Sequence, residues 1–119
     1  MNRTILTGRL IRDPELRTLA SGRTVAQFTL GAGEPGQTEY VSIVAWDQLA
    51  EAAAQLLGRR TLVAVEGRLQ TRQWDDDRGV RHWKTEIVAS SVELLTDRHR
   101  RQLAEPAKAA ASGLPGATP

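Results

Sequence analysis

Residues 63–74, VAVEGRLQTRQW, carry the clearest structural pattern of the chain, a strict alternation with a period of two. Small or apolar residues occupy one face of this pattern: Val63, Val65, Gly67, Leu69 and Thr71. Polar residues and a final indole occupy the other face: Glu66, Arg68, Gln70, Arg72 and Trp74. Successive side chains of a strand point to opposite faces, so the stretch predicts a strand with one face against a core.

The polar face of this strand combines two chemistries. Arginine neutralises phosphate, and an indole offers a flat surface on which a base can stack, which together suit single-stranded nucleic acid. An ordinary solvated face with Trp74 at its edge is the competing interpretation. The stretch alone leaves both open.

The composition sets limits on the class of protein. The 119 residues are enough for one compact domain, and 40% of them are apolar, which is enough for a core. No apolar run approaches the roughly 18 residues of a membrane span, and the N-terminus lacks the apolar segment of a signal peptide. The chain has no cysteine, so disulfides and thiolate metal sites are excluded. We expect a cytoplasmic protein without a membrane contact.

Other segments complete the pattern of a small barrel. Residues 2–11, 24–31, 39–47 and 80–89 are predicted strands, with a bulge or sharp bend at Gly8. Residues 48–57 are a predicted amphipathic helix whose apolar face is Leu49, Ala52, Ala53 and Leu56. We expect Asp47 to cap its N-terminus.

This order predicts the fold. Five strands with one helix between the third and the fourth are the order of the OB-fold, an all-β, five-stranded Greek-key barrel. We expect the barrel to span residues 1–96. Residues 97–119 are rich in Ala, Pro and Gly and predict a flexible tail, in which a short helix over 98–104 is one possibility.

The third predicted strand carries two aromatic side chains on one face. Tyr40, Ser42, Val44 and Trp46 share this face, and a second packing layer or a subunit contact is the alternative to a binding role. Phe28 and Trp83 are expected to pack, the first in the core and the second in the barrel or against a subunit.

The sequence offers no catalytic constellation. Residues 75–77 are three aspartates, which a hairpin turn favours, so we predict no metal site there. His82 and His99 are the only histidines, and no carboxylate pair has a plausible partner. We expect a binding protein rather than an enzyme, with no cofactor.

Four segments together resemble the bacterial single-stranded DNA-binding proteins. They are NRTILTGRLIRDPELR from residue 2, VAQFTL from residue 25, VEGRLQTRQW from residue 65 and WKTEIVA from residue 83. They occur in the family's order, and the resemblance runs from about residue 2 to residue 95. The resemblance implies non-specific binding of single-stranded DNA and its protection in replication, recombination or repair. It also implies a homo-oligomer, with a tetramer favoured over a dimer, and association with the nucleoid.

The resemblance also implies the binding residues. By position in the family's motifs, Tyr40, Trp46 and Trp74 are expected to stack bases. Arg3, Arg17 and Arg72 are expected to contact phosphates. Arg68 joins the phosphate set only because it lies on the same face of the strand.

The chain departs from the family at three places. The loop at residues 31–37 is short, Ser42 and Gln70 stand where some members have arginine, and no acidic residue follows Glu105. Members recruit replication enzymes through an acidic C-terminal tip, so we expect no such recruitment by this tail. The alternative function is a primosome-type OB-fold module that recruits replication proteins and binds DNA only secondarily.

Overall fold

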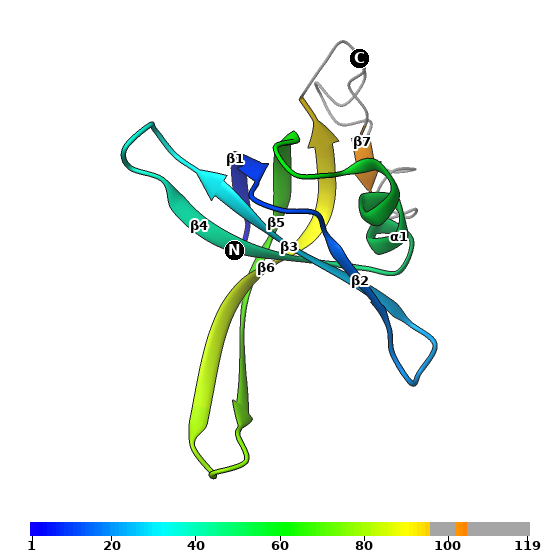
Figure 1. Ribbon diagram of the computed structural model, residues 1–119, viewed down its shortest axis with the longest axis vertical. Helices are drawn as coiled ribbons and strands as arrows, with labels where there is room; N and C mark the ends of the chain where they lie inside the picture. Colours follow the sequence, from blue (N-terminus) through cyan, green and yellow to red (C-terminus); the bar gives the residue numbers. More distant parts are fainter. Residues whose placement is uncertain (96–101, 105–119) are drawn as a thin grey trace.

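The computed structural model describes residues 1–95 and the backbone of residues 102–104. In chain order the elements are β1 (Thr4–Leu10), β2 (Glu15–Thr18), β3 (Thr24–Ala32), β4 (Glu39–Trp46), α1 (Asp47–Leu56), β5 (Leu62–Asp75), β6 (Arg81–Leu94) and β7 (Gln102–Ala104). Figure 1 shows a barrel at the centre, with α1 beside it and the β5–β6 hairpin projecting far beyond it.

Five strands close into a ring, which confirms the predicted OB-fold class. The order β1-β5-β6-β4-β3 returns to β1 through an additional β1–β3 pairing. All these pairings are antiparallel except β4 with β6, which run parallel and join Ile43 to Ile87 and Val44 to Val88. These five strands correspond to the five that the periodicity predicts.

Two glycines permit the sharp curvature of this small ring. Gly8 pairs with Val63 of β5 and also with Ala32 of β3, so β1 passes from one neighbour to the other at this residue. A Cβ at Gly8 would lie 2.6 Å from the carbonyl oxygen of Gly31. The bend predicted at Gly8 is therefore confirmed, and it depends on the missing side chain.

Gly67 allows a second close approach, beside a β-bulge. Glu66 pairs with Ser91 and Gly67 pairs with Ala89, so Ser90 of β6 has no partner in β5. A Cβ at Gly67 would lie 2.2 Å from the carbonyl oxygen of Val88. The bulge shifts the alternation of β6 by one residue, which is why β6 continues past the predicted end at residue 89 with Val92 still buried.

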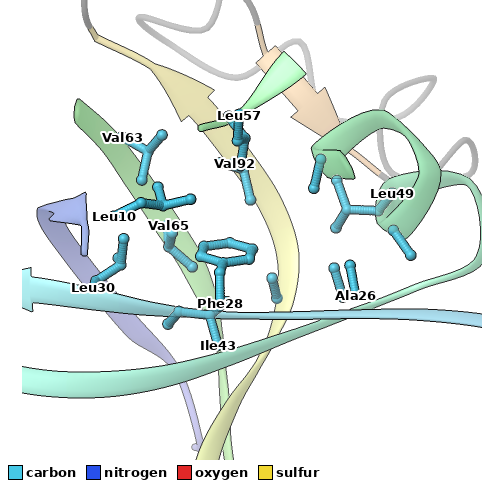
Figure 2. Close-up of a cluster of buried hydrophobic side chains, with 14 of the residues drawn as sticks. Leu10, Ala26, Phe28, Leu30, Ile43, Leu49, Leu57, Val63, Val65 and Val92 are labelled. Carbon is cyan, nitrogen blue, oxygen red and sulfur yellow. The ribbon is translucent and has the colours of Figure 1, made fainter. Parts of the chain in front are cut away.

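The core fills the barrel and extends under the helix. Phe28 is 2% exposed and lies among Leu10, Val65 and Ile43 in Figure 2, which confirms its predicted core position. Ile43 is fully buried. It therefore contributes no exposed apolar surface for a contact between subunits.

Helix α1 agrees with the prediction in position but not in detail. Its buried face is Leu49, Ala50 and Ala53, and Leu56 is 39% exposed. The N-cap is Trp46, without a side-chain hydrogen bond, so the cap predicted at Asp47 is wrong. The Asp47 carboxylate instead accepts two hydrogen bonds from Arg23, and a carboxylate so engaged does not cap the helix.

Two short strands were not predicted. Strand β2 pairs with β3, but all its residues are exposed, so it has no apolar alternation to reveal it. Strand β7 pairs with β6 over residues where a short helix was one expectation, and that expectation is wrong for residues 102–104. The rest of the tail expected over 97–119 lies outside the described residues. Within the described part, no helix is long and apolar enough to cross a membrane.

Candidate nucleic-acid interface

A groove runs over the outer face of the strands β3, β4, β5 and β6. Its lining residues are Arg17, Leu19, Val25, Gln27, Val44, Trp46, Gln70, Arg72, Glu86 and Val88. We call this surface the β-face groove. Its residues on β4 and β6 alternate with the core residues of the same strands, as a period of two requires. The groove brings together three of the predicted site residues, Arg17, Trp46 and Arg72, over an aliphatic floor.

The centre of the groove holds a buried carboxylate that the sequence analysis did not single out. Glu86 is 5% exposed, and its Oε1 accepts a hydrogen bond from Arg72 Nε at 2.8 Å. Ser42 Oγ donates to Oε2 at 3.5 Å, and Lys84 Nζ lies 3.9 Å from the same atom. Glu86 therefore fixes Arg72 at the groove floor. Glu86 pairs with Gln70 across the hairpin, and paired residues share a face. This pairing was the signal that could have placed Glu86 on the binding face.

Trp74 lies beyond Arg72 on the projecting hairpin and is 40% exposed. Its ring stacks on that of His82, with centroids 5.5 Å apart and planes inclined by 21°. The guanidinium carbon of Arg72 lies 4.7 Å from the Trp74 ring centroid, within cation–π range. The indole is thus oriented by two neighbours while much of its surface remains accessible.

The partner of His82 is one of the three turn aspartates. Asp76 Oδ2 lies 2.7 Å from His82 Nε2, while Asp76 Oδ1 accepts hydrogen bonds from the backbone N–H groups of Arg78 and Val80. The hydrogen bond from His82, followed by the one from Val80, lowers the pKa of Asp76. This aspartate holds the turn and His82 in place.

Trp46 has a similar environment on the opposite side of the groove. The guanidinium carbon of Arg23 lies 4.5 Å from its ring centroid. Arg23 donates from Nε and Nη2 to the two oxygens of Asp47, at 3.3 and 2.8 Å. These bonds lower the pKa of the Asp47 carboxyl. No local pattern indicates this contact, because it requires the β3–β4 register that sets Val25 opposite Trp46.

The remaining predicted residues lie outside the β-face groove. Tyr40 is 68% exposed at the start of β4, opposite Gly31. Arg3 and Arg68 line a neighbouring pocket with Glu66, which Arg3 contacts at 2.6 Å. Arg68 donates to the side chain of Gln70, a groove residue, so the two pockets adjoin along β5. The predicted set is therefore spread over several strands rather than gathered at one point.

Comparison with known proteins agrees with this geometry. Residues 1–95 match the Single-strand binding protein family. A single-stranded DNA-binding protein of Halalkalibacterium halodurans is 40% identical over 105 residues, which cover 82% of this chain and 62% of the relative. One from Caldanaerobacter subterraneus subsp. tengcongensis is 43% identical over 102 residues, 80% of this chain and 68% of the relative.

A third relative, single-stranded DNA-binding protein 1 of Staphylococcus aureus strain MSSA476, is 40% identical over 106 residues, covering 83% of this chain and 68% of its own length. The chain thus spans about two thirds of the length of these relatives, and somewhat less of the first. The family match covers most of the chain and coincides with the barrel and its hairpin. The chain therefore belongs to the single-strand binding protein family.

Proposed function

We propose that this protein binds single-stranded DNA without sequence specificity and protects it during replication, recombination or repair. The observation that carries the proposal is the β-face groove, where Trp46 stands beside the aliphatic floor and Arg17 and Arg72 supply positive charge. Bases need flat or apolar surfaces and the backbone needs cations, and a groove with both accepts any base because every base has a π-face. The role is binding rather than catalysis.

In this proposal Trp46, Trp74 and Tyr40 stack bases. Their order along the surface follows the strands, with Trp46 in the groove, Trp74 on the hairpin and Tyr40 at the far end of β4. Arg17 and Arg72 meet phosphates in the groove, and Arg3 and Arg68 continue the path along β5. Such a path favours an extended strand over a duplex, whose bases are already stacked on one another.

The relatives' names support this function over a primosome-type interaction module, since each is named for single-stranded DNA. Binding to chromosomal DNA would place the protein in the cytoplasm at the nucleoid. We include a homo-oligomer in the proposal, with a tetramer favoured. Exposed apolar side chains outside the groove support it, namely Ile5 at 65% and Trp83 at 62%. Light scattering at micromolar concentration tests it, and a monomeric mass would contradict it.

The function is tested by the anisotropy of a labelled oligo(dT) and of a labelled duplex. We expect tight binding of the single strand only. Trp74→Ala should weaken it by about ten- to a hundredfold, because one stacked base is worth ~1–3 kcal/mol. Gln73→Ala is the matched control, since Gln73 precedes Trp74 on the opposite face of β5. Equal affinity for both DNA forms, or a Trp74 variant that binds like the control, would overturn the proposal.

A further inference from the structure

The Trp46 site contains an arginine that no motif assigns to binding. Arg23 lies immediately before β3, and its guanidinium lies over the Trp46 ring. The two carboxylate oxygens of Asp47 hold it through Nε and Nη2. The Arg23 and Asp47 side chains are 54% and 51% exposed, so an anion in solution can approach the pair.

The same arrangement of indole, guanidinium and carboxylate occurs at Trp74. There Arg72 lies over the indole and Glu86 anchors the guanidinium. Arg72 and Trp46 both line the β-face groove. Trp46 thus lines the groove and Trp74 lies beyond it on the hairpin, and each indole carries a guanidinium that a carboxylate already orients.

Orientation matters for the energetics of binding. Ordering a long side chain on binding costs conformational entropy, and an arginine held beforehand avoids part of that cost. An exposed ion pair adds little to stability, so a phosphate can compete with the carboxylate for the guanidinium. A nucleotide stacked on Trp46 would place its phosphate within reach of such a cation, as the two groups are in contact.

We propose that Arg23 is a further phosphate-binding residue, held against Trp46 by Asp47 until the DNA backbone engages it. The proposal rests on the proposed function and extends the DNA path from the groove to the β2–β3 hairpin. It also explains why Asp47, with a positive φ of 56°, does not cap the helix: its carboxylate is turned to Arg23.

A single substitution cannot test this role, because Arg23→Ala leaves the negative charge of Asp47 beside Trp46, where it would repel DNA. The test is therefore the double variant Arg23→Ala/Asp47→Asn, which keeps the net charge. Asparagine tolerates the left-handed conformation at position 47, and thermal unfolding verifies the fold. The matched control is Arg81→Ala/Asp75→Asn. That pair is about equally exposed, at 55% and 54%, and on β5 Asp75 alternates with the groove residues.

Oligo(dT) affinity is measured as a function of salt for the wild type and both variants. We expect the Arg23 double variant to bind more weakly and to flatten the plot of log affinity against log salt by about 0.7, one phosphate contact. The control should keep the wild-type slope. A wild-type affinity and slope for Arg23→Ala/Asp47→Asn would show that Arg23 only neutralises Asp47, and would overturn the inference. Failure of the wild type to bind oligo(dT) would instead overturn the proposed function.

Discussion

The two halves of the β5–β6 hairpin obey one alternation but have different surroundings. In the barrel half, Val63 and Val65 are 0% and 1% exposed, and Gly67, beside the bulge, is also buried. From Arg68 to Asp75 every residue of β5 is exposed, although the alternation continues. Leu69, on the core side by its position, is 49% exposed. A period of two tells which side chains share a face, but it does not tell what covers that face.

The loss of one neighbouring strand explains this difference. The pairing of β1 with β5 ends where Thr4 faces Gly67, and the pairing of β4 with β6 ends at Ile87, which faces Leu69. Beyond Leu69 the hairpin is therefore a two-stranded ribbon. Two-stranded ribbons are marginal in water, and this one relies on cross-strand side-chain pairs. They are Thr71 with Thr85, Arg72 with Glu86, Trp74 with His82, and Asp75 with Arg81. The barrel half supplies stability, and the ribbon supplies surface.

The largest effect that separates the halves should come from an added methyl group. Gly67→Ala would force a Cβ against the carbonyl of Val88, and we expect a loss of about 3 kcal/mol in the free energy of unfolding, at the upper end for overpacking. Gly79→Ala, in the turn of the ribbon, meets no atom within 4 Å and is opposed only by its φ of 79°, so it should cost about 1 kcal/mol. Urea unfolding measures both, and equal losses would break the comparison.

A smaller difference should come from truncating one side chain in each half. Val65→Ala removes buried methyl groups and should cost about 2 kcal/mol, whereas Leu69→Ala acts at a half-exposed site and should cost less than about 0.5 kcal/mol. The same urea experiment applies. A Leu69 variant as damaging as the Val65 variant would indicate that another copy of the chain covers the ribbon.

The smallest effect concerns the end of the ribbon and its response to acid. The hydrogen bond from His82 lowers the pKa of Asp76 from its ordinary value of 3.8. The stability that this hydrogen bond adds to the folded state is therefore present above pH 3.8, and it is lost as the pH falls through the lowered pKa. We expect the Asp76 carboxyl carbon to titrate below pH 3.8 by NMR, and His82→Ala to raise its midpoint toward 3.8. A midpoint unchanged by His82→Ala would contradict the role of this pair. The Val65 amide, in the barrel, should stay protected through the same titration.

The sequence predicted the barrel because each of its strands has an apolar face that a core must bury. Alternation alone predicted the buried position of Phe28, whereas the choice of Arg17, Trp46 and Arg72, which line one groove, also needed the family resemblance. The sequence analysis missed β2, which is exposed throughout, and it misassigned Asp47, whose partner Arg23 is distant in the chain. Glu86 was missed for a related reason: its burial depends on Arg72 and Ser42, which reach it from two other strands. Contacts between residues of different strands or helices leave no local pattern in the sequence.

The parallel pairing of β4 with β6 affects how fast the chain folds. Hairpins such as β5–β6 join neighbours in sequence and form within about 1–10 μs, but the ring cannot close until Ile43 meets Ile87 across the intervening helix and β5. Non-local pairing of this kind raises the contact order, and barrels dominated by it fold in milliseconds to seconds. Until that contact forms, the edges of β4 and β6 are open to any other strand in solution. The order in which the chain folds therefore determines how long it is exposed to mispairing.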